Sequence, residues 1–187
     1  MDGADAMYQV IYADPPWRYR NGKTGGSHRS GAAQHYPTLT PAAVAALPLP
    51  PLAPAATLWL WATVPLLPEI LPVMQAWGFR YTTALCWHKT GRRGIGFWLR
   101  GEFELLLLGV RGRVPAFRSS LPNVIRAPWD GHSVKPAGVR DLIETLTPGQ
   151  RRIELFARRP SCAAWTCTGL ESDGTDLRAV SRDTGAA

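Results

Sequence analysis

Short apolar runs, separated by turn residues, divide the chain into segments of strand length. The tripeptide Asp14-Pro15-Pro16 ends the first run, and Gly101 and Gly112 bound the fourth. The pattern predicts strands over residues 9–13, 56–63, 79–88, 103–110 and 153–157. Residues 56–63 are apolar at successive positions, which is typical of a strand buried on both faces in the middle of a parallel sheet.

Helical periodicity occurs between these runs. The spacing of Val139, Leu142, Ile143 and Leu146 predicts a helix over residues 136–146, and a second helix is expected over 65–78 with a bend at Pro72. Strands that alternate with helices predict an α/β domain with a mainly parallel central sheet flanked by helices. The apolar pattern fades after the last strand, so we expect a domain over 1–172 and a flexible tail over 173–187.

The chain is basic, with a formal net charge of +7 over 187 residues. Clustered cations favour a polyanionic partner such as nucleic acid. Only Lys23, Lys89 and Lys135 are lysines, however, and the remaining basic residues are arginines in a chain rich in Ala, Gly and Pro. A GC-rich genome would produce the same bias, so the charge alone gives weak support for a nucleic-acid partner.

Composition also argues against several other classes of protein. Three cysteines are too few for a disulfide scaffold and fit a reducing cytoplasm. The four histidines are scattered, so no metal site is expected. Prolines interrupt the uncharged stretch over 41–68, and residues 1–13 lack the pattern of a signal peptide, so we expect a cytoplasmic protein that does not associate with a membrane.

The tetrapeptide Asp14-Pro15-Pro16-Trp17 follows the first predicted strand, where α/β sheets bind ligands. An exocyclic amine of adenine is a poor nucleophile because its lone pair is delocalised into the ring. The amine improves when two acceptors hold its hydrogens, and the Asp14 carboxylate and the Pro15 carbonyl are such acceptors. Two prolines stiffen the turn, and Trp17 offers a face on which a flipped base could stack. The alternative interpretation is a strand break with a buried Trp cap.

At this point the sequence resembles the MT-A70 family of adenine methyltransferases, related to the catalytic subunit of the messenger-RNA adenosine methyltransferase. The resemblance covers about residues 9–171 and rests on an ordered series of short segments. These segments are Asp14-Pro15-Pro16-Trp17, Tyr36-Pro37-Thr38-Leu39-Thr40, Leu60-Trp61-Ala62-Thr63, Trp87-His88-Lys89-Thr90, Gly96-Phe97-Trp98-Leu99-Arg100, Glu104, Gly109-Val110-Arg111-Gly112, His132-Ser133-Val134-Lys135-Pro136, Ile153-Glu154-Leu155-Phe156-Ala157-Arg158 and Trp165. Each piece is weak alone, but the set in this order is specific.

The resemblance implies a Rossmann-like fold that uses S-adenosylmethionine, in a circularly permuted order with the catalytic motif first and a sheet of about seven or eight strands. Asp14, Pro15, Pro16 and Trp17 would bind the target adenine, and Tyr36 would line its pocket. The residues implied in cofactor binding are Asp14, Lys135, Glu154, Arg158, Gly169 and Glu171. The residues placed at the substrate entrance are Trp17, Tyr36, Trp87, Lys89, Arg92 and Arg93.

Each of these roles has a structural alternative. Trp61, Trp87 and Trp98 are equally typical of a hydrophobic core, Glu154 and Arg158 could form a salt bridge, and the basic loops could be a solvated face. One departure from the family pattern concerns the cofactor site, because Leu170 stands where an Asn is usual and cannot form a side-chain hydrogen bond. Glu171 can still accept hydrogen bonds from ribose hydroxyls.

The function that this sequence predicts is methylation of the exocyclic amine of adenine in DNA by an S-adenosylmethionine-dependent enzyme. Methylation of RNA and a noncatalytic nucleic-acid-binding scaffold subunit are the alternatives. The compact, Arg-rich chain favours DNA over RNA as the partner. Whether the chain forms a homo-oligomer or needs a protein partner stays open at this stage.

Overall fold

The computed structural model describes residues 7–19, 38–91, 98–117, 120–129 and 134–177. The elements follow one another as β1 (Tyr8–Ala13), α1 (Pro41–Ala45), β2 (Leu52–Ala62), the 3-10 turn η3 (Val64–Leu66), α2 (Leu67–Ala76), β3 (Arg80–Thr90), β4 (Phe103–Arg111), β5 (Val124–Pro128), α3 (Gly138–Leu146), β6 (Arg152–Leu155) and β7 (Thr166–Thr168).

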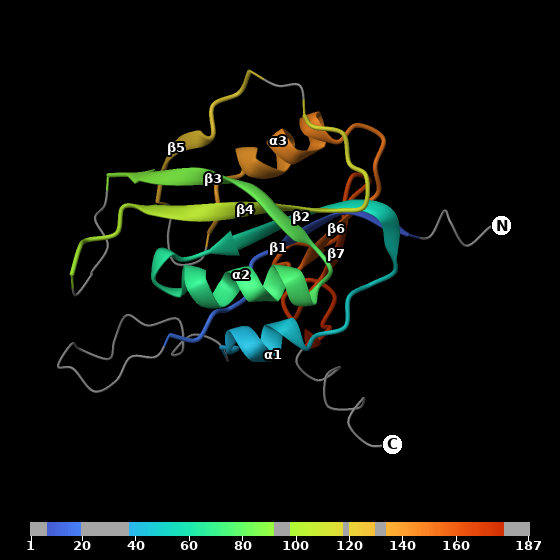
Figure 1. Cartoon of the computed structure of the whole chain (residues 1–187), viewed down its shortest axis with the longest axis horizontal. Coiled ribbons are helices and arrows are strands. Elements are labelled where there is room, and N and C mark those ends of the chain that lie inside the picture. The colour runs from blue at the N-terminus through green and yellow to red at the C-terminus, as the bar shows by residue number, and fades with distance from the viewer. Residues whose placement is uncertain (1–6, 20–37, 92–97, 118–119, 130–133, 178–187) are drawn as a thin grey trace.

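The strands form a seven-stranded sheet in the order β5-β3-β4-β2-β1-β6-β7. β4 runs antiparallel to its neighbours β2 and β3, and the other pairings are parallel. Helices α1 and α2 cover one face of this sheet and α3 covers the other (Figure 1). As a result, the carboxyl ends of β1, β2, β3 and β6 and the amino end of β4 all lie at the same edge.

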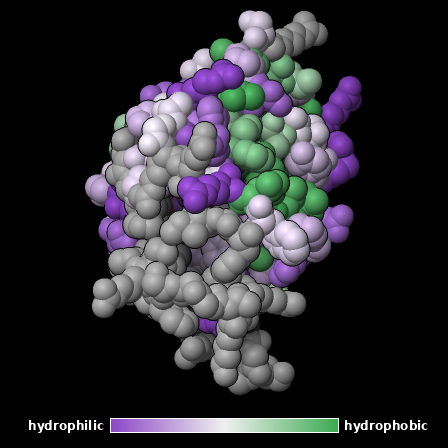
Figure 2. All heavy atoms as spheres, turned by 90° about the vertical axis from the view of Figure 1, so that its left-hand side faces the viewer, coloured by the Kyte–Doolittle hydropathy of each residue, from purple (hydrophilic) through white to green (hydrophobic). Residues whose placement is uncertain are grey.

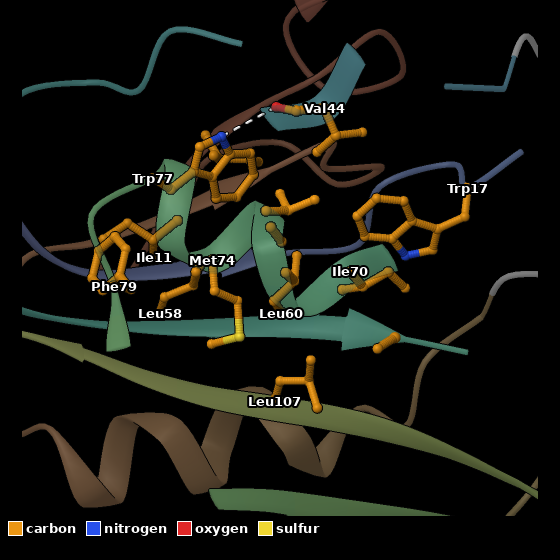
Figure 3. Close-up of a cluster of buried hydrophobic side chains, with 14 of the residues drawn as sticks. Ile11, Trp17, Val44, Leu58, Leu60, Ile70, Met74, Trp77, Phe79 and Leu107 are labelled. Carbon is orange, nitrogen blue, oxygen red and sulfur yellow. Dashed lines mark hydrogen bonds between the residues drawn. The ribbon is translucent and has the colours of Figure 1, made fainter. Parts of the chain in front are cut away.

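Side-chain alternation along each strand produces two separate cores. On the α1 and α2 face, Ile11, Leu60 and Leu107 pack against Ile70 and other residues of α2. In this core the Trp77 indole N–H donates to the Val44 carbonyl at 3.1 Å and ties α2 to α1 (Figure 3).

The core on the α3 face is richer in aromatic side chains. Tyr12, Trp61 and Trp87 come from three different strands and pack with Trp165, which precedes β7. Val139 and Ile143 of α3 close this core from above. Burying large aromatic rings stabilises this layer through both area and ring geometry.

The expected α/β fold is confirmed, and each predicted strand and helix has a counterpart in the structure. The expectation for residues 56–63 was wrong in one respect, because β2 pairs in parallel with β1 but antiparallel with β4. The sheet is therefore mixed. An apolar run shows that a strand is buried on both faces, but it does not carry the direction of the neighbouring strand.

Three short elements were missed by the sequence reasoning: α1, β5 and β7. Each has five residues or fewer, which is too short for a period to show. Among the described residues, no helix has the length and apolar composition that a bilayer span requires.

Gly112 supports the turn after β4 and provides a test of this packing. Its φ is 64°, and a Cβ there would lie 2.1 Å from the Pro54 carbonyl oxygen of β2. We expect Gly112→Ala to lower the free energy of unfolding by about 2–4 kcal/mol, measured by chemical denaturation.

Gly138 is the matched control, because a Cβ at the start of α3 would meet no atom within 4 Å. We expect Gly138→Ala to be neutral or to stabilise by up to about 1 kcal/mol. An equal loss of stability in both variants would contradict the close approach of Gly112 to β2.

Candidate active site

Charged side chains from distant parts of the sequence meet at the carboxyl edge of the sheet, on the α3 face. Asp14 follows β1, Lys89 and Glu104 lie on β3 and β4, Glu154 lies on β6, and Lys135 precedes α3. Figure 2 looks onto this end of the molecule and shows hydrophilic side chains beside a hydrophobic patch. The edge is where open α/β sheets bind their ligands.

The shortest link across this edge joins Asp14 to Lys135. The Lys135 ammonium donates to Asp14 Oδ2 at 2.7 Å, although the two residues are 121 positions apart. Their side chains are only 26% and 14% exposed. The Coulomb attraction within an ion pair is stronger in such a partly desolvated place than in water, and it offsets the cost of desolvating the two groups, so the pair holds both side chains in a defined arrangement.

Glu104 extends this pair into a row of alternating charges. One carboxylate oxygen lies 3.4 Å from Lys135 Nζ, and the other lies 2.5 Å from Lys89 Nζ. The row runs Asp14, Lys135, Glu104, Lys89, so its two negative and two positive groups balance. Sequence reasoning placed Glu104 in the motif series but gave it no role, because its two partners lie on other elements.

Each lysine ammonium group in this row lies over the face of a tryptophan ring. Lys135 Nζ lies 5.2 Å from the centroid of the Trp61 ring, and Lys89 Nζ lies 5.0 Å from that of Trp87. The two rings meet edge to face, and the Trp61 indole N–H donates to the Tyr12 hydroxyl at 2.7 Å. The rings attract the ammonium groups through their negative faces and keep them at fixed height above the sheet.

The site continues past β1 to β6 and α3. Arg140 of α3 lies 3.2 Å from Glu154 Oε2, and its guanidinium lies 4.8 Å from the Trp165 ring centroid. The Trp165 ring also contacts Tyr12 edge to face. Trp165, Tyr12, Trp61 and Trp87 therefore form a continuous aromatic shelf, and Arg140, Lys135 and Lys89 lie against its three tryptophan rings.

Burial and pairing set the charge state of the central residues. Burial would lower the pKa of Lys135, but Asp14 and Glu104 outweigh it and hold this pKa above its ordinary value. Burial would raise the pKa of Glu104, but Lys135 and Lys89 outweigh it and hold this pKa below its ordinary value. Burial raises the pKa of Asp14 despite the opposing effect of Lys135. At neutral pH, Lys135 is cationic and Glu104 is anionic.

The structure corrects the expected role of Trp17. Its side chain is 5% exposed and lies in the core on the α2 face, near Ile70 and Leu60 (Figure 3). Asp14 lies on the opposite, α3 face, where it pairs with Lys135 above the Trp61 ring. Its indole N–H donates to the Trp61 carbonyl at 2.9 Å. A ring packed in this way does not offer a flat face to a base. It anchors the turn instead, which is the buried cap that the sequence left open.

The two prolines lie between these opposed side chains. The Pro15 carbonyl accepts from the Trp17 N–H at 2.8 Å, and the Pro16 carbonyl accepts from Leu39 N–H at 2.8 Å. Each carbonyl oxygen has a second lone pair, so Pro15 keeps one acceptor position for a ligand. The turn is thus fixed at both ends by hydrogen bonds that do not involve Asp14.

The expected substrate residues have different fates. Trp87 is 2% exposed and donates to the Ala127 carbonyl, so it belongs to the shelf and not to an open entrance. Lys89 lies in the row of charges described above. Tyr36, Arg92 and Arg93 lie outside the described residues.

The remaining expected cofactor residues lie beyond β6 and β7. Arg158 Nε is 3.6 Å from Glu171 Oε1, and both side chains are substantially exposed. Gly169 accommodates a close approach, because a Cβ there would lie 2.6 Å from Ala157 backbone atoms. Its N–H donates to Asp173 Oδ1 at 3.0 Å, and backbone N–H groups lower the pKa of Asp173 to about 2. Leu170 is 56% exposed, in keeping with a side chain that contributes no hydrogen bond.

Phe156 marks the same region by its backbone. It is the non-glycine residue with a positive φ, 60°, among the described residues, and it directly follows β6. Residues held in this strained conformation cluster at ligand sites. Sequence patterns carry no signal for such a conformation at a Phe.

A mixed seven-stranded sheet covered by helices on both faces, with its charged residues gathered at the carboxyl edge, is consistent with a Rossmann-like methyltransferase fold. The sequence profile of the MT-A70 family matches residues 8–171. The chain belongs to this family.

Individual relatives agree with the family match. The chain is 32% identical over 182 residues to the type II methyltransferase M.MunI of Mycoplasma sp. This alignment covers 88% of the chain and 77% of M.MunI. It is 31% identical over 179 residues to the human N(6)-adenosine-methyltransferase catalytic subunit METTL3, covering 91% of the chain. The chain spans only 29% of the length of METTL3.

The row of charges predicts a characteristic dependence of stability on pH. Because the folded pKa of Glu104 is below its ordinary value, its contribution is complete above pH 4.5 and is lost as the pH falls through the folded pKa. We expect Glu104→Gln to lower the free energy of unfolding by about 2 kcal/mol at neutral pH. Chemical denaturation from pH 3 upward should show this difference shrinking in the acid.

Glu102→Gln is the control, because that side chain is two residues away and 40% exposed. Its effect should stay below about 1 kcal/mol at every pH. A deficit of Glu104→Gln that is the same at pH 3 and pH 7 would contradict the assigned charge state.

Proposed function

We propose that this protein transfers a methyl group from S-adenosylmethionine to the exocyclic amine of adenine in DNA. The observation that carries the proposal is the ion pair between Asp14 and Lys135 at the carboxyl end of β1, at 2.7 Å. A carboxylate and an ammonium held side by side can bind a positive and a negative ligand group at the same time. Family membership supports the same reaction class.

The described residues fit the cofactor by the chemistry of their groups. Its amino-acid end is a zwitterion, and Lys135 would bind the carboxylate while Asp14 accepts from the ammonium. Glu154 and Glu171 supply acceptors for ribose hydroxyls or the adenine amine, and Arg158 and Gly169 lie beside them at the ends of β6 and β7. When bound, the cofactor supplies an electrophilic methyl group.

Asp14 and Pro15 prepare the amine that accepts this methyl group. With its hydrogens held by the Asp14 carboxylate and the Pro15 carbonyl, the nitrogen lone pair is directed out of the base plane. A nitrogen that accepts a methyl group while keeping both hydrogens would be positively charged, so it must lose one proton. The Asp14 carboxylate is the nearby acceptor, and the burial that raises its pKa favours protonation.

The other residues position this pair. Trp17 anchors the turn from the opposite face, and Trp87 supports Lys89 from below. We assign Tyr36, Lys89, Arg92 and Arg93 to binding of the nucleic-acid substrate, the arginines as contacts to phosphate. A target base in a duplex would be flipped out to reach Asp14.

One of two observations favours DNA over RNA. The chain carries a net charge of +7, which suits a polyanion without choosing between them. The match spans 77% of the type II methyltransferase but only 29% of the N(6)-adenosine-methyltransferase subunit, so it takes in a larger share of the former. We therefore place DNA first, and RNA is the alternative substrate in the test.

The experiment is methyl transfer to matched single-stranded DNA, duplex DNA and RNA oligonucleotides, followed by mass spectrometry of the nucleosides. We expect N6-methyladenine from a DNA arm and no product from the same oligonucleotide with purine in place of adenine. Product from RNA alone would exclude DNA as the substrate. An absence of product in all arms, together with an absence of cofactor binding, would exclude methyl transfer.

Asp14→Ala should reduce methyl transfer by about 100-fold or more, because it removes both an acceptor for the amine and the proton acceptor. Asp141→Ala is the matched control, since Asp141 is exposed on α3. Rates measured at saturating cofactor separate this loss from weaker binding. Equal rates for Asp14→Ala and the native chain would remove Asp14 from the chemistry.

Lys135 and Lys89 form a second matched pair, because both are mostly buried and both contact Glu104. We expect Lys135→Met to weaken S-adenosylmethionine binding by about tenfold or more in calorimetry, through loss of a charge-assisted contact. Lys89→Met should leave this affinity within about threefold and instead raise KM for the oligonucleotide. If Lys89→Met weakened cofactor binding and Lys135→Met raised KM for the oligonucleotide, the cofactor role would belong to Lys89 and the substrate role to Lys135.

A further inference from the structure

We infer that Arg140 is a positioning residue that holds the Glu154 carboxylate in place for the cofactor. Neither the motif series nor the tetrapeptide chemistry draws attention to Arg140, which lies inside the helix predicted over 136–146 as an ordinary polar position. The inference rests on the proposed function, because Glu154 is a cofactor residue only if the chain binds S-adenosylmethionine.

The contact between the two side chains is direct and sheltered. Arg140 Nη1 lies 3.2 Å from Glu154 Oε2, and both side chains are 15% exposed. The arginine comes from α3 and the glutamate from β6, so the contact spans the gap between helix and sheet. Glu154 pairs in register with Tyr12 of β1, two residues before Asp14, and so lies next to the proposed methyl-transfer centre.

Arg140 is itself held by groups that do not touch the ligands. Its guanidinium lies over the Trp165 ring at 4.8 Å, and the Trp165 indole N–H donates to Glu144 Oε1 at 2.6 Å. Glu144 lies on α3, one turn after Arg140. A planar guanidinium that stacks on a fixed ring loses little freedom when it pairs with a carboxylate, whereas a lysine would lose more.

The groups around Glu154 give the pair a measurable consequence. Arg140 approaches from α3 and Cys167 Sγ from β7 at 4.0 Å, while Asp14, Tyr12 and Arg159 come from β1 and from the segment after β6. Burial raises the pKa of Glu154, and Arg140 is the largest opposing influence. Without Arg140 the carboxyl would take up a proton at higher pH, and a protonated carboxyl is a poorer acceptor for ligand hydrogen bonds.

The test compares Arg140→Met and Arg140→Lys with the native chain in calorimetric titrations of S-adenosylmethionine from pH 5 to pH 9. Carbon-13 spectra of the glutamate side chains, with Glu154→Gln to assign the signal, follow the Glu154 pKa in the same proteins without ligand. Arg152→Met is the matched control. Arg152 of β6 donates to Thr147 and to the Glu144 carbonyl at the carboxyl end of α3, and among the described residues it forms no ion pair with Glu154.

We expect Arg140→Met to bind the cofactor about tenfold more weakly at pH 7, with the Glu154 pKa raised further. Binding should then be lost at a higher pH as the solution is acidified, and it should recover toward pH 9. Arg140→Lys should lie between, because it keeps the charge but loses the planar fork. Arg152→Met should lower stability while the affinity and its pH profile stay native.

The outcomes separate this inference from the proposed function. If both Arg140 variants bind the cofactor with the affinity, pH profile and Glu154 pKa of the native chain, the positioning role is overturned. That result would leave the methyltransferase proposal intact. Failure of the native chain to bind S-adenosylmethionine would overturn both. If Arg140→Met does not fold, the same measurements on Arg140→Lys decide the question.

Discussion

The arrangement of the site depends on the free-energy cost of placing charges at a partly desolvated edge of the sheet. Lys89, Lys135 and Arg140 each lie over a tryptophan ring and against a carboxylate, within the described part of the chain. A charge that is removed from water without a partner is strongly unfavourable, so each cation requires its carboxylate and each carboxylate its cation. The alternation of signs along the edge follows from this requirement.

The aromatic shelf explains how such a row can be held at defined positions. Trp61, Trp87, Trp165 and Tyr12 come from different elements, and they contact one another edge to face or through the hydrogen bond between Trp61 and Tyr12. Packing in the core restricts the rings to one conformation. The cations that lie over these rings are therefore held in defined positions. The same aromatic rings therefore belong both to the hydrophobic core and to the polar site.

The short turn after β1 places side chains with different roles on the two faces of the sheet. Asp14 lies on the α3 face with Lys135, whereas Trp17 lies in the opposite core and bonds to the Trp61 carbonyl. The two prolines between them connect the Asp14 carboxylate to the buried Trp17 anchor. This division accounts for a Trp in the motif without requiring that it contact a base.

The sequence alone determined the α/β class, because apolar period and turn residues depend on local steric rules and on burial of whole faces. It also identified the family and proposed Asp14, Lys135 and Glu154 as site residues, since both rest on residue types in a fixed order. The direction of β4, the short elements α1, β5 and β7, and the burial of Trp17 and Trp87 depended on which segments pack together. Glu104 and Arg140 show the reason most clearly: their partners lie on other strands and helices, and only the tertiary structure brings opposite charges from distant positions within reach of each other.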